Sequence, residues 1–168
     1  HPNLENVLHC ATASSRTTHA APEALESCAL FANLLHSVLL GCEKSMLFAQ
    51  VQCRLQEPKL VTMASGAFIA KSESQIRGNG YCVDSLEAAL WCFFNTDSFE
   101  SAILKAANLG EDADTTAAIV GQIAGAFYGV DAIPAHWLAR LAMRDDIAQD
   151  HWCPPHDLRP RSADWQVS

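Results

Sequence analysis

Apolar residues recur at helical spacing over much of the chain. From Leu25 to Leu39 they return every three or four positions, which places a broad apolar stripe on one side of a helix. Pro22 stands where a first helical turn would begin, and Gly41 stands where the stripe stops. The pattern therefore predicts a long helix between Pro22 and Gly41.

Weaker patterns lie on both sides of this helix. Residues 1–12 carry a few apolar positions typical of a helix end, and residues 13–20 are polar, which predicts a loop. Residues 43–56 have apolar positions four apart and predict a second helix, which Glu57-Pro58 would end. Residues 59–77 hold a short helical pattern followed by a polar stretch, so most of them receive no assignment.

The second half of the chain alternates tight turns with helical patterns. Residues 78–81 read Gly-Asn-Gly-Tyr and predict a turn. Asp84 with Glu87 three residues later is typical of a capping box, which predicts the start of the next helix. After another turn and cap, residues 99–108 predict a short helix. Residues 132–141 predict the last helix, with its Trp and Leu side chains facing inward.

The domain organisation follows from these patterns and from the composition. Hydrophobic residues make up 49% of the 168 residues and charged residues 18%, which is typical of a packed globule and not of a disordered chain. We predict one all-α domain over residues 1–150, because no linker interrupts the helical patterns. Residues 151–168 are polar and rich in proline, which predicts an irregular tail.

Charge and cysteine content narrow the class of protein. A net charge of −8 disfavours nucleic acid and anionic membranes as partners. No apolar run approaches the ~20 residues of a membrane span, and the first residues do not resemble a signal peptide. The seven cysteines are odd in number and scattered, which favours buried thiols over disulfides or a zinc site. We therefore predict a cytoplasmic protein.

Three oxygen-bearing side chains, Asp112, Asp114 and Thr115, precede a helical run that ends at Gly129. Carboxylates are favoured at a helix start, because the first N–H groups are unpaired and the helix dipole is positive there. One interpretation is helix capping, which the Asp-x-Asp-Thr spacing alone favours. The other is a metal site, because hard oxygen ligands suit Mg²⁺, Mn²⁺ or Ca²⁺.

Small residues share one face of this helical run. Ala117, Gly121 and Gly125 lie four positions apart, and a glycine inside a helix costs about 1 kcal/mol relative to alanine. We expect close approach of another backbone in return. The pattern thus predicts that this helix is the central and most enclosed one.

A longer string of residues favours metal binding over capping through a resemblance to a known family. Residues 109–118 read Leu-Gly-Glu-Asp-Ala-Asp-Thr-Thr-Ala-Ala, and glycines, Ile133-Pro134 and Trp137 follow at matching places. This string resembles the ADP-ribosylglycohydrolase family. The resemblance implies a compact orthogonal helical bundle built around two Mg²⁺ or Mn²⁺ ions. It also implies that Asp112, Asp114 and Thr115 are metal ligands.

The same resemblance extends to three residues outside the acidic cluster. His19, in a Ser-x-x-Thr-His segment, corresponds to a histidine near the bound ADP-ribose, and the alternative is a structural role. Gly80 and Tyr81 correspond to a segment that contacts the nucleoside. There Gly80 would allow the ligand to come close and Tyr81 would stack on it. From spacing alone, residues 78–81 are a simple connection between helices.

The implied activity is hydrolysis of the N- or O-glycosidic bond that joins ADP-ribose to a modified protein or small molecule. The resemblance covers about residues 12–141 and corresponds only to the later part of a family member. The family's Gly-Asp-Ala-x-Gly and Thr-Asp-Asp-Thr segments and its catalytic acid have no counterpart here, so no catalytic residue is assigned.

Two alternatives stay open at this point. The chain is an inactive relative that binds ADP-ribose or has a structural role, or it is a helical interaction module whose acidic turn is only a cap. Helical faces that the missing part would cover predict self-association or a second chain that completes the fold.

Overall fold

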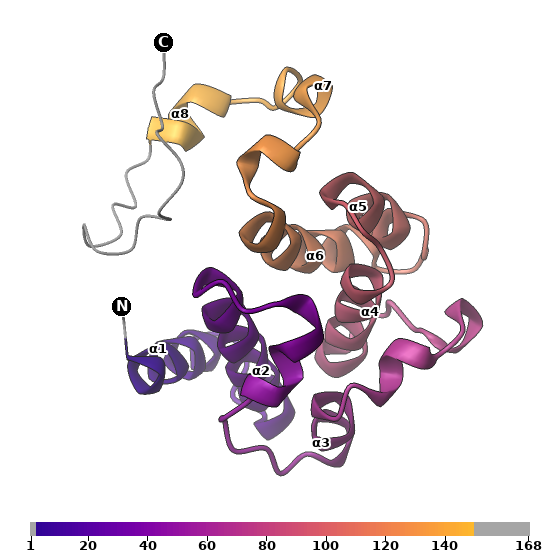
Figure 1. The fold of residues 1–168 in the computed structure, drawn as a ribbon. Helices are drawn as coiled ribbons and strands as arrows, with labels where there is room; N and C mark the ends of the chain where they lie inside the picture. The colour runs from indigo at the N-terminus through magenta and orange to yellow at the C-terminus, as the bar shows by residue number, and fades with distance from the viewer. Residues whose placement is uncertain (1–2, 150–168) are drawn as a thin grey trace.

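Within residues 3–149, which the computed structural model describes, every element is helical (Figure 1). The predicted all-α class is confirmed, whereas the predicted tail at residues 151–168 lies outside the described residues. The α-helices are α1 (Leu4–Arg16), α2 (Pro22–Leu39), α3 (Pro58–Ala64), α4 (Cys82–Phe94), α5 (Phe99–Ala107), α6 (Ala113–Tyr128), α7 (Ala135–Leu138) and α8 (Arg144–Gln149). The 3₁₀ helices are η1 (Lys44–Gln50), η2 (Ala67–Ala70), η3 (Glu73–Gln75) and η4 (Val130–Ala132).

Helix α4 is the most enclosed helix of the described bundle. Nine of its 13 residues are buried, and it packs against α2, α3, α5, α6 and η2. Helix α6 buries only four residues, so the prediction that it is the most enclosed was wrong. A Cβ built on Gly121 would lie 3.6 Å from Ile103, and one on Gly125 would lie 3.8 Å from Phe99. The glycines therefore make room for α5 side chains, not for another backbone.

Helix α1 continues through part of the predicted loop at residues 13–20. Asn3 caps its first turn, with Oδ1 accepting a hydrogen bond from the Glu5 backbone N–H at 3.1 Å. The helix packs along α2, and none of its residues is buried. Its last turn is polar because only one side of the helix is covered, so the polarity of residues 13–16 did not indicate a loop.

The predicted helix at residues 43–56 is instead η1 followed by an extended segment. Asn33 of α2 is fully buried and explains this conformation. Its Oδ1 accepts hydrogen bonds from the backbone N–H groups of Gln52 and Cys53 at 2.8 and 3.2 Å, and its Nδ2 donates to the Gln50 carbonyl at 3.2 Å. The Asn33 side chain thus supplies these backbone groups with the hydrogen-bond partners that a continued helix would otherwise provide.

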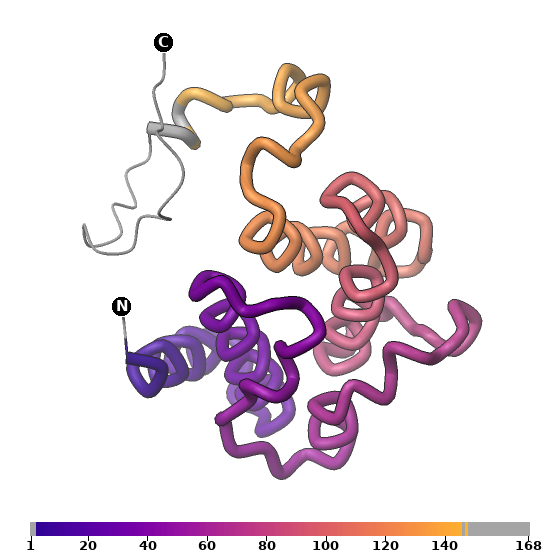
Figure 2. Tube along the Cα trace, in the orientation of Figure 1, coloured from indigo at the N-terminus to yellow at the C-terminus, as the bar shows by residue number. Residues whose placement is uncertain are grey.

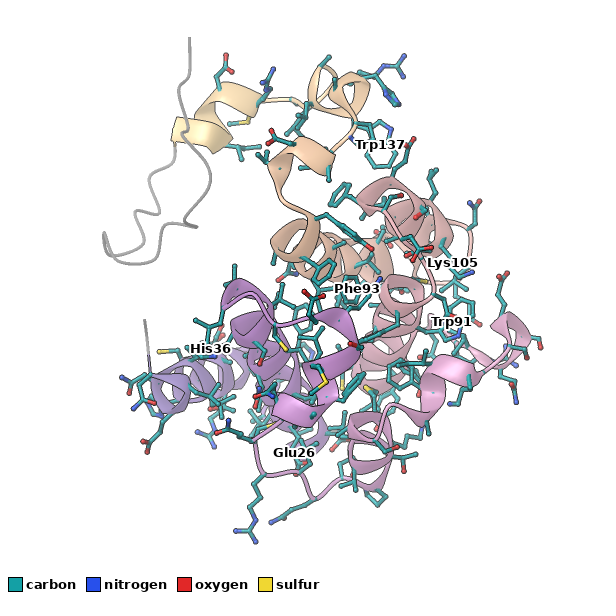
Figure 3. All side chains as sticks on the ribbon, viewed as in Figure 1. Glu26, His36, Trp91, Phe93, Lys105 and Trp137 are labelled. Atoms are coloured by element: carbon teal, nitrogen blue, oxygen red, sulfur yellow. The ribbon has the colours of Figure 1, made fainter. Side chains whose placement is uncertain are left out.

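A second side chain of α2 holds the end of this segment. Glu26 Oε2 accepts hydrogen bonds from the backbone N–H groups of Gln56 and Glu57 at 2.8 and 2.9 Å (Figure 3). These residues stand at the start of α3, where N–H groups lack partners within the helix. From α3 the chain passes through η2 and η3 before it enters α4 (Figure 2).

Helix α4 begins two residues earlier than its predicted cap. Tyr81 is the N-cap residue, and Asp84 lies in the first turn. The predicted capping box of Asp84 and Glu87 was wrong, because both carboxylates pair with lysines. Lys59 Nζ lies 3.2 Å from Asp84, and Lys71 Nζ lies 2.8 Å from Glu87.

An aromatic cluster closes the other end of α4. The ring of Phe93 makes edge-to-face contacts with Phe94, Phe127 and Tyr128, at centroid distances of 5.2, 5.5 and 6.3 Å (Figure 3). Lys44 Nζ lies 4.3 Å from the Phe93 centroid and donates to the Thr96 carbonyl at 2.6 Å. Burial lowers the pKa of Lys44, and the charge of Asp97 opposes this shift.

The last predicted helix, residues 132–141, is broken into short pieces. Helix α7 spans only Ala135–Leu138 and is preceded by η4. The ring of Trp137 packs against that of Phe99 at 6.3 Å between centroids, in agreement with the prediction that Trp137 faces inward. Leu141 is 48% exposed, so its inward prediction was wrong. It follows the short α7 and does not share the packed side of Trp137.

The cysteines are less buried than predicted. The six described cysteines are free thiols, of which only Cys92 is buried, whereas Cys10 is exposed. Burial raises the pKa of the Cys92 thiol to about 12. In the described part of the chain, no helix has the length and apolar character needed to cross a membrane.

Candidate metal and nucleotide site

The connection from α5 to α6 is a tight turn through left-handed backbone. Gly110 has φ of 78°, and Glu111 follows with φ of 55°. Glycine adopts this conformation easily, whereas for glutamate it costs on the order of 1 kcal/mol. The turn delivers Asp112 to the N-cap position of α6.

The predicted metal ligands lie together at this helix start. Asp112 is half-buried at the N-cap, whereas Asp114 and Thr115 are exposed in the first turn. The Asp112 side chain makes no capping hydrogen bond, which argues against the capping interpretation for this residue. Its carboxylate therefore pairs with none of the free N–H groups at the start of α6.

The carboxyl groups of Asp112 and Asp114 interact. The pKa of Asp114 is lowered, first by the backbone N–H of Thr115, then by a hydrogen-bond contact with the Asp112 side chain, and also by its own backbone N–H. Asp114 is therefore ionised at neutral pH, as a metal-binding carboxylate must be.

These donors fit one side of a Mg²⁺ or Mn²⁺ site. Two carboxylates and a hydroxyl are hard oxygen ligands, and two of the three residues face solvent. Within residues 3–149, no group of three or more His, Cys, Asp and Glu side chains is arranged to hold a metal ion. Because Mg²⁺ takes about six oxygen ligands, water or further groups would have to complete the coordination.

The loop before α4 lies against the acidic cluster. The Asp112 backbone N–H donates to the Gly78 carbonyl at 2.8 Å. A Cβ built on Gly80 would lie 4.0 Å from Asp112 Oδ2, so the structure brings Gly80 beside the predicted metal ligands. Because glycine has no side chain, there is space at Gly80 next to the Asp112 carboxylate.

Tyr81 follows directly and is 36% exposed. Lys59 Nζ lies 5.0 Å from its ring centroid, which is within the range of a cation–π contact. The pKa of Tyr81 is raised mainly by desolvation and next by the charge of Glu23. Sequence reasoning missed Lys59, because nothing in its local pattern points to a tyrosine in another segment.

His19 lies in the turn between α1 and α2 and is exposed. Its Nδ1 lies 3.1 Å from the Thr18 hydroxyl, and its backbone N–H donates to the Ser15 carbonyl at 2.7 Å. These contacts stay within the turn and do not link the ring to the acidic cluster. Its role as a substrate contact stays a prediction.

A charged cavity of about 450 Å³ lies beside the Tyr81 loop, between α3 and α4. The sequence did not indicate it. Its walls hold the Lys59–Asp84 and Lys71–Glu87 ion pairs described above, so most of its charges are already paired. The lining residues are Pro58, Lys59, Thr62, Lys71, Gln75, Arg77, Val83, Asp84 and Glu87.

The profile of the family described as ADP-ribosylglycohydrolase matches residues 1–163. The chain belongs to the ADP-ribosylglycohydrolase family. The family inferred from the acidic cluster and its neighbours is thereby confirmed.

Curated relatives have related names. The chain is 44% identical over 133 residues to ADP-ribosylarginine hydrolase Tri1 of Pseudomonas putida, covering 79% of this chain and 36% of the relative. It is 38% identical to the protein of the same name from Serratia proteamaculans, covering 87% and 40%. It is 33% identical to ADP-ribosyl-[dinitrogen reductase] glycohydrolase of Rhodospirillum rubrum, covering 79% and 42%. The chain thus spans less than half the length of these relatives.

A solved structure supports the same fold. The similarity to a chain described as an ADP-ribosylglycohydrolase-related protein complex has a TM-score of 0.78 at 41% sequence identity. It covers 88% of this chain and 50% of that chain. The all-α architecture described above is therefore the architecture of this family.

Proposed function

We propose that this chain is part of a metal-dependent hydrolase that removes ADP-ribose from modified arginine side chains. The bond cleaved would be the N-glycosidic bond between the ribose and the guanidinium. Two relatives, at 44% and 38% identity, are named ADP-ribosylarginine hydrolase, which favours arginine over other linkages.

One observation carries the proposal: the acidic helix start lies against the Gly78–Tyr81 loop. Asp112 and Asp114 would hold Mg²⁺ or Mn²⁺ together with Thr115, and Gly80 would let the ribose approach them. When bound, the two ions supply concentrated positive charge beside an anionic nucleotide. Tyr81 would contact the nucleoside, and the N–H groups at the start of α6 would add positive potential.

A second candidate function is ADP-ribose binding without hydrolysis. It is favoured by the small donor set, since residues 3–149 contain no larger cluster of potential metal ligands. The two functions share the same site and differ in whether this chain alone turns over its ligand.

Metal binding is the first test. We expect the protein to bind Mn²⁺ with a dissociation constant on the order of 0.1–1 mM, because only three side chains contribute ligands. Asp114→Ala should weaken binding at least about tenfold, since it removes a charged ligand. The measurement is electron paramagnetic resonance of free Mn²⁺ during a titration.

Glu100→Ala is the matched control for this titration. Glu100 is an exposed acid at the second residue of α5, as Asp114 is in α6, but the N-cap residue before it is Ser98 and not an aspartate. Its removal should leave the Mn²⁺ affinity unchanged. Equal affinities for the wild type and Asp114→Ala would contradict the metal site.

Turnover separates the two candidate functions. The protein is incubated with Mn²⁺ and an ADP-ribosylated arginine peptide, and released ADP-ribose is measured by chromatography. Release that disappears in Asp112→Ala supports the hydrolase. A rise in melting temperature with ADP-ribose, without release from the peptide, supports the binding protein. Neither release nor a rise would contradict both.

A further inference from the structure

The acidic loop and the Gly78 loop are joined by a buried contact of three residues, which we call the seam: Gly78, Asp112 and Thr116. Gly78 is buried, and its carbonyl accepts the Asp112 backbone N–H at 2.8 Å. Thr116 is fully buried in the first turns of α6. Its Oγ1 donates to the Asp112 carbonyl at 3.0 Å, and its backbone N–H donates to the same oxygen at 3.1 Å.

The seam leaves little room for a side chain on Gly78. A Cβ at that position would lie 3.3 Å from Thr116 Oγ1 and 3.7 Å from the Gly110 carbonyl oxygen. The first distance is shorter than an ordinary van der Waals contact, and the buried threonine has little space to move. Glycine at this position therefore lets the two loops meet.

The backbone of Asp112 differs from that of the other capped helix starts. Asn3 and Ser98 are extended, with ψ of 134° and 159°, and their side chains accept capping hydrogen bonds. Asp112 has ψ of 57° and makes no such bond. Aspartate is among the best N-cap residues, so an unrestrained Asp112 would be expected to turn its carboxylate onto the start of α6.

We propose that the seam holds Asp112 out of the capping conformation and thereby keeps its carboxylate available for the metal ion. Gly78 and Thr116 are then positioning residues. Gly78 bonds the backbone N–H of Asp112 and Thr116 bonds its carbonyl, whereas neither bonds its side chain. This inference rests on the proposed metal-dependent function. It adds two residues to the site that act without touching metal or substrate.

The seam also explains why the strained turn before Asp112 is stable. Glu111 has φ of 55°, a conformation that costs free energy for a residue other than glycine. Relaxation of that turn would rotate the next residue, which is Asp112. The hydrogen bond from the Asp112 N–H to the Gly78 carbonyl opposes this rotation. The seam therefore helps to hold the backbone dihedral angles of Glu111 and Asp112.

The main test is the Mn²⁺ affinity of Gly78→Ala, measured by electron paramagnetic resonance. We expect a loss of about tenfold or more, because the added methyl group separates the loops and frees Asp112. Gly121→Ala is the matched control, since a Cβ there would lie 3.6 Å from the Ile103 side chain of α5, which is an ordinary van der Waals contact. It should keep the wild-type affinity and melt at the same or a higher temperature.

A second pair of variants tests the hydroxyl of Thr116. Thr116→Val keeps the shape but removes the donor to Asp112, so Mn²⁺ binding should weaken about threefold to tenfold. Thr116→Ser keeps the hydroxyl and should bind like the wild type. The double variant Gly78→Ala/Thr116→Val should be about as weak as the weaker single variant, because both act on one contact.

The outcomes separate this inference from the proposed function. If the wild type binds no Mn²⁺, the metal site and the seam's role both fail. If the wild type binds but Gly78→Ala and Thr116→Val bind equally well, the site stands and the positioning role is overturned. A lower melting temperature with unchanged Mn²⁺ affinity would likewise reduce the seam to a structural contact. Should Gly78→Ala fail to fold, the Thr116 pair decides by the same criterion.

Discussion

Replacing Asn33 by leucine should lower the free energy of unfolding by about 3–5 kcal/mol, which is a large part of the stability of a small domain. Asn33 is fully buried and satisfies three backbone groups, one at the last residue of η1 and two in the segment after it. Leucine has a similar size but leaves these groups without partners, at roughly 1–3 kcal/mol for each one that stays buried. Urea denaturation followed by circular dichroism measures the change.

Asn108→Leu is the control for this experiment. Asn108 is exposed at the end of α5, where its amide donates to the Leu104 carbonyl of the same helix. We expect a loss below about 1 kcal/mol, because water can replace that hydrogen bond. Comparable losses for the two variants would show that Asn33 does not anchor the segment.

Replacing Phe93 by alanine should cost about 3–5 kcal/mol of unfolding free energy. The ring is fully buried at the centre of the aromatic cluster, and its removal leaves a cavity beside Phe94 and Phe127. The variant also loses the cation–π contact with Lys44 at 4.3 Å. Thermal and urea unfolding should both report the loss.

Two further variants serve as comparisons for the stability loss expected of Phe93→Ala. Phe93→Leu keeps much of the apolar volume and should cost less than the alanine variant. Leu104→Ala removes a side chain that is 46% exposed and should cost about 1 kcal/mol or less. If Phe93→Ala unfolds at the same denaturant concentration as Leu104→Ala, the cluster is not a major source of stability.

The main helices were predictable because apolar periodicity is a local property. The stripe between Pro22 and Gly41 predicted α2, and the apolar run that ends at Gly129 predicted α6. The segment after η1 was not predictable in the same way. Its conformation depends on Asn33 and Glu26, which lie in a different helix and act through side-chain hydrogen bonds. A periodic pattern carries no information about such partners.

The candidate site likewise combines features that local sequence predicts with contacts that it does not predict. The acidic helix start was predictable from Asp112, Asp114 and Thr115, because carboxylates at a helix entry show in a short string. Their role as metal ligands came from the family resemblance and stays a prediction. The contact of Lys59 with Tyr81 and the seam between Gly78 and Thr116 join segments that are distant in sequence. These contacts appear only when the helices are packed. They define how the recognised residues are held.

The hydrogen bond between Gly78 and Asp112 has a thermodynamic consequence for a site that takes two ligands. It ties the loop expected to receive the nucleoside to the loop expected to receive the cation. If a cation reduces the motion of one loop, it also lowers the entropy that the nucleotide must lose in the other. Reciprocity then requires that the nucleotide strengthen cation binding by the same factor.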